Sequence, residues 1–166
     1  MTVSGKANTQ GLPPICNDMG TLAPKFRERV EKALLECSQI EGLDPIVYET
    51  LRSQDLQTAY YARGRTVVPP YQPVTEQADV QHSWHAFGLA VDIISRTRGW
   101  DTDSDWQQQV ATVFKRNGID WGNDWPTFKD YPHFQFGGMK QAPSDLARQL
   151  YQTGGLQAVW EAVGAA

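Results

Sequence analysis

Cysteine and histidine are scarce in this sequence, which has two cysteines and three histidines among its 166 residues. Because no C-x-x-C pair occurs, a metal site or redox centre based on cysteine is not expected. Cys16 and Cys37 are expected to be free thiols, as in a reducing compartment, although a disulfide between the N-terminal segment and the first helix is compatible with the sequence. Cysteine is therefore a poor candidate for binding a metal.

Long hydrophobic runs and an excess of basic residues are also absent. No stretch approaches the roughly 18 apolar residues of a membrane span, and residues 1–8 lack the apolar core of a signal peptide. The net charge of −4 offers no electrostatic footprint for nucleic acid and no broad basic face for an anionic membrane. We therefore expect neither as a stable partner. We expect a protein that is made in the cytoplasm without an export signal of its own.

The length and the 40% hydrophobic content fit one globular domain, which we expect to be a monomer. Hydrophobic periodicity and turn residues predict helices at 23–40, 53–62, 106–117 and 144–163, the last broken at Gly154-Gly155. Short strands are predicted at 44–51, at 133–136 and within 86–95, where the buried run is 89–94. A strand or turn is predicted at 119–125, and an extended loop at 64–80. The predicted fold is α+β, with a small central antiparallel sheet flanked by helices. Its parts are an N-terminal arm (1–20), a main domain (21–140) and a C-terminal helical tail (141–166) packed on that domain.

The segment from Ser83 to Asp92 joins a histidine to an apolar run that contains a carboxylate. A carboxylate inside an apolar strand is costly unless it is paired, hydrogen-bonded or bound to a metal. Taken alone, Asp92 could form an ion pair with Arg52 or Arg96. A single histidine such as His85 is most often a hydrogen-bonded loop or core residue.

The set of residues changes this interpretation. His85 and His133 both border apolar runs of the predicted central strands, and Asp92 lies within one of them. Two imidazoles and one carboxylate suit zinc, although manganese or cobalt could occupy the same ligands. Three protein ligands also leave a fourth position open for water, which is typical of a catalytic site. The sequence therefore predicts a zinc site at the sheet.

Two other residues have the chemistry that metal-assisted hydrolysis needs. Asp130 lies three residues before His133, and Pro132 favours an extended chain before it, so the Asp130 carboxylate is expected beside the metal-bound water as a general base. Arg52 follows the predicted strand at 44–51 and offers a guanidinium to a developing oxyanion. Taken alone, Asp130 could be a surface turn residue and Arg52 an ordinary arginine paired with a carboxylate.

These motifs resemble those of the zinc peptidases of the VanY and D-Ala-D-Ala carboxypeptidase group. The first motif of that group, S-x-H-x-x-G-x-A-x-D, is matched by Ser83, His85, Gly88, Ala90 and Asp92. The second motif, a histidine in an apolar strand with an acid three residues earlier, is matched by the segment 130–133. The D-x-P-H context and the block at 51–66 are most similar to phage endolysins that act as L-alanyl-D-glutamate endopeptidases.

The resemblance implies a role for each matching residue. The expected zinc ligands are His85, Asp92 and His133, the expected catalytic acid/base is Asp130, and the residue expected to stabilise the oxyanion is Arg52. Ser83 is expected to lie behind the metal ligands and to hydrogen-bond one of them. His82 is an additional candidate for contact with substrate, although an ordinary structural role is the favoured interpretation of this residue.

The implied function is hydrolysis of the L-alanyl-D-glutamate bond in the stem peptide of peptidoglycan, with residues 21–140 as the catalytic domain. An endolysin of this kind is expected in the host cytoplasm until a separate export or lysis factor releases it to the cell wall. Two alternatives stay open, namely a zinc D,D-carboxypeptidase that releases terminal D-Ala and a non-catalytic, zinc-stabilised module that binds the wall. Gln135 stands where lysostaphin-type glycyl endopeptidases have the second histidine of an H-x-H pair, which argues against that branch. The tryptophans near the motifs could be core residues or the wall of a groove; they are Trp84, Trp100, Trp121 and Trp125.

Overall fold

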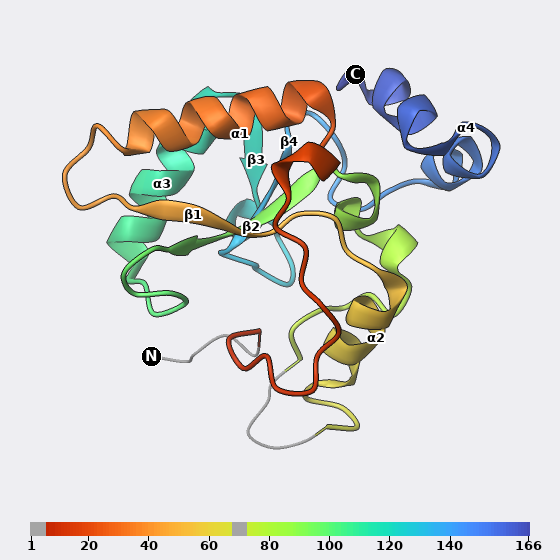
Figure 1. Ribbon diagram of the computed structural model, residues 1–166, viewed down its shortest axis with the longest axis horizontal. Helices are drawn as coiled ribbons and strands as arrows, with labels where there is room; N and C mark the ends of the chain where they lie inside the picture. Colours follow the sequence, from red (N-terminus) through yellow and green to blue (C-terminus); the bar gives the residue numbers. More distant parts are fainter. Residues whose placement is uncertain (1–5, 68–72) are drawn as a thin grey trace.

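The computed structural model describes residues 6–67 and 73–166 (Figure 1). The α-helices in these residues are α1 (Pro24–Cys37), α2 (Gln54–Ala62), α3 (Ser104–Arg116) and α4 (Asp145–Val163). The strands are β1 (Pro45–Glu49), β2 (Ala90–Ser95), β3 (Ile119–Trp121) and β4 (His133–Phe136). Short 3₁₀-helices precede β2, namely η2 (Val80–His82) and η3 (Trp84–Phe87), and two more are η1 (Met19–Thr21) and η4 (Gly122–Asp124).

The strands form one antiparallel sheet in the order β1-β2-β4-β3. Figure 1 shows α1 and α3 together on one side of the strands and α2 on the other side. Buried side chains from α1, α3 and β4 form the main core, and they include Phe26, Val30, Val110, Phe114, Phe134 and Phe136. The predicted α+β fold with a small antiparallel sheet is therefore confirmed.

The register of the sheet determines which polar side chains meet. Asp92 in β2 pairs with His133 in β4 and with Glu49 in β1, so the three residues form one row across three strands. The pairing of β1 with β2 shifts by one residue between Val47 and Glu49. A bulge of this kind redirects a side chain, because neighbouring residues of a strand point to opposite faces. Without the shift, Tyr48 would lie opposite Asp92.

Local signals explain most of the helix boundaries. Pro24 lies in the first turn of α1, and the Ser53 hydroxyl accepts a hydrogen bond from the backbone N–H of Leu56 (3.2 Å) at the start of α2. Both features were expected from the sequence. α3 begins two residues before the predicted start, because the Asp103 carboxylate accepts from the N–H of Trp106 (2.8 Å). α1 ends at Cys37 rather than at residue 40, since the chain turns there.

The remaining segments lie around this core. The predicted loop at 64–80 is partly outside the described residues, and α4 contains the expected break, with a φ of 67° at Gly155. Cys16 and Cys37 are both free thiols. Among the described residues, none of the helices combines the length and the apolar character that a membrane span requires. The division into arm, main domain and tail stays a prediction.

Candidate metal centre and substrate pocket

His85 is held in place by a short turn that the first motif encodes. The Ser83 hydroxyl accepts a hydrogen bond from the backbone N–H of His85 (3.3 Å) and caps η3, while Gly88 ends it with a φ of 65°. A Cβ at Gly88 would lie 2.4 Å from the backbone carbonyl oxygen of Thr21, so only glycine fits. Ser83 therefore bonds the backbone of the predicted ligand and shapes the turn, with no bond to the imidazole among the described contacts.

The three predicted ligands meet in the interior of the protein. His85, Asp92 and His133 each offer one ligand atom, and these atoms lie within 4.8 Å of one another. Asp92 Oδ1 is 3.2 Å from Nε2 of His85 and 4.0 Å from Nδ1 of His133, and the Asp92 side chain is 0% exposed. Their side chains come from η3, β2 and β4.

Hydrogen bonds on the outer side of both imidazoles determine where their protons lie. Nδ1 of His85 is 2.8 Å from the backbone carbonyl oxygen of Thr50, which can only accept, so Nδ1 carries the proton. Nε2 of His133 is 2.9 Å from Oε1 of Gln135, whose amide nitrogen donates to the carbonyl oxygen of Lys140 (3.1 Å). That donation identifies Oε1 as the oxygen, so Nε2 of His133 also carries the proton.

The opposite nitrogen of each ring therefore has its lone pair directed inward. Nε2 of His85 and Nδ1 of His133 both face the carboxylate oxygen of Asp92, which is an acceptor too. Burial lowers the pKa of His133 to about 3, so the His133 ring is neutral. Three acceptors directed at one point form a suitable site for a cation, and two nitrogens with one carboxylate oxygen fit zinc.

The second oxygen of Asp92 faces two basic groups. Oδ2 is 2.7 Å from Nζ of Lys6 and 3.5 Å from a terminal nitrogen of Arg52. Burial alone would raise the pKa of Asp92, but the charges of Lys6 and Arg52 lower it well below its usual range. Asp92 is therefore ionised, with one oxygen directed to the metal position and the other to the cations.

Arg52 is fixed by a buried polar network that the sequence did not suggest. Glu49 accepts from Nε of Arg52 (2.6 Å) and from a terminal nitrogen (3.0 Å), and Gln57 accepts from the other terminal nitrogen (3.0 Å). The Tyr60 hydroxyl donates to Glu49 Oε2 (3.2 Å). Arg52 is thus an arginine paired with a carboxylate, as the simpler interpretation had it, and it also lines the pocket. Glu49 interrupts the apolar run at 45–49, just as Asp92 interrupts its own apolar run. This signal could have indicated Glu49.

Asp130 lies on the turn that leads into β4. Its carbonyl oxygen accepts from the N–H of His133 (3.2 Å), and its own N–H donates to the carbonyl oxygen of Gly122 (3.2 Å). A Cβ at Gly122 would lie 2.5 Å from the Asp130 carbonyl oxygen, so this close approach requires glycine. Burial raises the pKa of Asp130, and Asp92 adds to this, although Lys6 opposes it. A half-buried carboxylate with a raised pKa has the properties of a general base.

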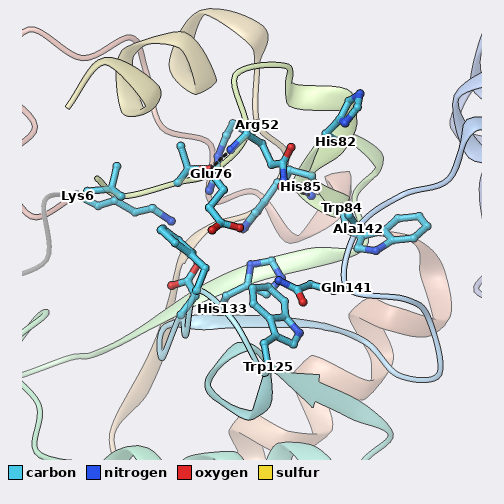
Figure 2. Close-up of a pocket in the computed structure, with 16 residues that line it drawn as sticks. Lys6, Arg52, Glu76, His82, Trp84, His85, Trp125, His133, Gln141 and Ala142 are labelled. Atoms are coloured by element: carbon cyan, nitrogen blue, oxygen red, sulfur yellow. Dashed lines mark hydrogen bonds between the residues drawn. The ribbon is translucent and has the colours of Figure 1, made fainter. Parts of the chain in front are cut away.

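One pocket of about 250 Å³ is lined by Lys6, Arg52, His85, Asp130 and His133 (Figure 2). Figure 2 shows Lys6 reaching in from one side and Trp84 on the opposite side. The ring of Trp125 lies against His133, with centroids 4.8 Å apart, and His82 and Gln141 are also in the lining. Trp125 and Trp84 therefore line the pocket, whereas the other two tryptophans near the motifs, Trp100 and Trp121, are buried residues outside it.

Sequence reasoning missed several residues of the site. Lys6 was part of an arm without a motif, and Gln57 carried no recognisable spacing, whereas Glu49 interrupts an apolar run. Gln135 was considered only because it replaces a histidine, and its hydrogen bond with His133 was not predicted. The structure brings His82, Ser83 and all five of the predicted catalytic and metal-binding residues to the same pocket or to its immediate wall, but their chemical roles stay predictions.

Comparison with known proteins agrees with the geometry. The model of a family described as D-alanyl-D-alanine carboxypeptidase matches residues 76–136, a range that contains the three predicted ligands and Asp130. The chain is 32% identical to the peptidoglycan L-alanyl-D-glutamate endopeptidase CwlK of Bacillus subtilis, over 62% of this chain and 66% of that protein. It is 29% identical to an L-alanyl-D-glutamate peptidase of a Listeria phage, over 63% of this chain and 34% of that protein.

A solved structure has the same fold. The crystal structure of the Serratia marcescens L-Ala D-Glu endopeptidase ChiX superposes with a TM-score of 0.55 at 25% identity, over 71% of this chain and 82% of that one. The chain spans just under two thirds of the Bacillus subtilis relative and about a third of the phage relative. The resemblance expected from the two motifs is confirmed.

Proposed function

From its resemblance to the D-alanyl-D-alanine carboxypeptidase family, we propose that this chain is a zinc endopeptidase that hydrolyses the L-alanyl-D-glutamate bond of peptidoglycan. The observation that carries the proposal is the convergence of two imidazole lone pairs and a carboxylate oxygen beside a pocket that also contains Asp130. The choice of bond is supported by relatives named for L-alanyl-D-glutamate cleavage.

His85, Asp92 and His133 would hold the metal, as argued from the chemistry of the three donors. Bound zinc supplies a Lewis acid that lowers the pKa of a water molecule toward neutrality. The Asp130 carboxylate accepts a proton from the attacking water and then delivers it to the leaving nitrogen. The raised pKa of Asp130 suits both steps, because the group must hold the proton between them.

Arg52 provides positive charge where the attacked carbonyl oxygen becomes negative. Its guanidinium lines the pocket, and Glu49 and Gln57 prevent it from moving. A charge that is oriented in advance stabilises a transition state without reorganisation during the reaction. We therefore assign Arg52 to stabilisation of the oxyanion.

The proposed partner is bacterial peptidoglycan, and the proposed working form is a monomer. As an endolysin, the protein would remain in the host cytoplasm until a separate lysis or export factor gives it access to the wall. Manganese or cobalt could replace zinc in the same ligand set.

The test is digestion of purified peptidoglycan, followed by mass spectrometry of the fragments and identification of new ends. New amino-terminal D-glutamate supports the proposal. Release of D-Ala would instead identify a D,D-carboxypeptidase, and binding without cleavage would identify a wall-binding module; either result would overturn the proposal.

Two variants separate catalysis from metal binding. Asp130→Ala is expected to keep zinc and to lose activity by several orders of magnitude, on the order of the 10²–10⁴-fold that general base catalysis contributes or more. His133→Ala is expected to lose both, since it removes a ligand. Asp101→Ala, which removes an exposed carboxylate, serves as the matched control. Substantial activity in Asp130→Ala would show that the base has been assigned wrongly.

A further inference from the structure

Lys6 occupies a position that is unusual for a lysine of an N-terminal arm. Its side chain is 4% exposed, and its Nζ lies 2.7 Å from Oδ2 of Asp92 and 5.3 Å from the ring centroid of Tyr60. Figure 2 shows the side chain pointing into the pocket that His85 and His133 also line. A buried ammonium is costly unless it is compensated by negative charge.

The arm that carries Lys6 is tied to the rest of the protein. The backbone N–H of Thr50 donates to the carbonyl oxygen of Cys16 (2.7 Å), beside the end of β1. The Tyr48 hydroxyl donates to the carbonyl oxygen of Lys6 itself (3.4 Å). These contacts hold the arm along the end of β1, where the side chain of Lys6 enters the pocket.

The positive and negative charges of the buried groups in the site do not balance when a divalent ion is bound. The carboxylates Glu49, Asp92 and Asp130 carry three negative charges when ionised, whereas Arg52, Lys6 and a divalent ion carry four positive charges. The imidazoles add none when they are neutral. Glu76 also lines the pocket, but its side chain is exposed, so water and salt screen its charge. The buried and half-buried groups of the loaded pocket therefore have an excess of one positive charge, and an anionic substrate would neutralise it.

The proposed substrate has such an anion close to the bond that is cut. Glutamate has two carboxyl groups, and a peptide chain can continue through only one of them. The other remains a carboxylate, a few bonds from the nitrogen that hydrolysis releases. A pocket that cleaves before D-glutamate must either solvate this charge or pair it with a cation.

We propose that Lys6 is a specificity-determining residue that binds the free carboxylate of the D-glutamyl residue. This inference rests on the proposed function. Lys6 is better suited than Arg52, because Glu49 binds Arg52 through two hydrogen bonds and Gln57 binds its remaining terminal nitrogen. The ammonium is held at the pocket by Oδ2 of Asp92, the oxygen that does not face the imidazoles.

The test compares two peptides that differ only in that group, one with the free carboxylate and one with a carboxamide in its place. The wild-type enzyme is expected to prefer the carboxylate. In Lys6→Met the ratio of kcat/KM for carboxylate over carboxamide is expected to fall by about 30-fold or more, as when one partner of a buried charge pair is removed. Lys32→Met, which removes an exposed lysine from α1, is expected to leave the ratio unchanged.

A second measurement does not depend on turnover. Calorimetry on the zinc-loaded protein measures binding of the product peptide that begins with D-glutamate, and Lys6→Met is expected to weaken it by a similar factor while Lys32→Met does not. Chelator competition is expected to show that Lys6→Met binds zinc at least as tightly as the wild type, because a cation next to Asp92 has been removed.

Two results would overturn the inference. An equal loss of activity on both peptides would give Lys6 only a structural role, and an equal gain would identify the arm as an obstruction that must leave before substrate binds. Cleavage at a different bond would refute the proposed function instead. In that case the calorimetric comparison of carboxylate and carboxamide peptides would still decide whether Lys6 binds the carboxylate.

Discussion

Replacing Gln135 by leucine tests whether the outer hydrogen bond of His133 prepares that ring to bind metal. Gln135 is 1% exposed, and its Oε1 accepts from Nε2 of His133 at 2.9 Å. Leucine removes the acceptor without adding charge or much volume. The buried Nε2–H then has no partner, which costs about 1–3 kcal/mol. The ring can avoid this cost by moving its proton to Nδ1, the nitrogen that faces Asp92.

Either response weakens the metal site. Loss of such an outer hydrogen bond typically lowers metal affinity by about 10- to 100-fold, which corresponds to roughly 1.4–2.7 kcal/mol. We therefore expect Gln135→Leu to bind zinc about 10- to 100-fold more weakly, as measured by competition with a chelator of known affinity. Gln135→Glu retains an acceptor and is expected to bind zinc at least as tightly as the wild type.

A control is needed for general loss of packing. Gln107→Leu removes an amide in α3 that donates to Thr102 and does not line the pocket of the predicted ligands. It is expected to leave zinc affinity within about twofold. The reasoning fails if folded Gln135→Leu binds zinc as tightly as Gln107→Leu does, because the proton on His133 would then not depend on Gln135.

Two other substitutions test the framework of the site. Glu49→Gln leaves the buried guanidinium of Arg52 without its full counter-charge, so we expect about 3 kcal/mol of destabilisation in urea unfolding, whereas a loss below about 1 kcal/mol would contradict the buried ion pair. In Gly88→Ala the new residue would have to keep a φ of 65°, and its Cβ would lie 2.4 Å from a backbone carbonyl oxygen. We therefore expect the thermal midpoint to fall by at least about 4 °C and zinc affinity to drop with it. An unchanged midpoint would show that the turn before β2 can adapt.

The metal ligands were predictable because their signal is local. His85 and Asp92 belong to one short segment, and a carboxylate in an apolar run needs an explanation wherever it occurs. Histidine is also rare in this chain, so few combinations had to be considered. The helix caps are local too, and the Asp103-Ser104 pair at the start of α3 carried a cap signal that the hydrophobic pattern alone did not reveal.

The contacts of Glu49 and Lys6 with Asp92 were not predictable, because they join distant segments of the chain. Glu49 faces Asp92 only because the strand pairing shifts by one residue after Val47, and periodicity in the sequence does not show such a shift. Lys6 reaches Asp92 from 86 residues away. Neither contact has a spacing rule, since each arises from the path of the chain rather than from its local conformation.

The hydrogen bonds around the imidazoles keep the negative charge of the metal ligands low. Both outer partners, the carbonyl of Thr50 and the amide of Gln135, are uncharged, so they orient the rings without adding negative charge. Carboxylates in those positions would make the ligands more basic and the bound water less acidic. With neutral partners, the only full negative charge among the ligands is that of Asp92. The Oδ2 atom of Asp92 in turn holds Lys6 and faces Arg52, so the same carboxylate links the metal position to the cations that we propose to act on the substrate.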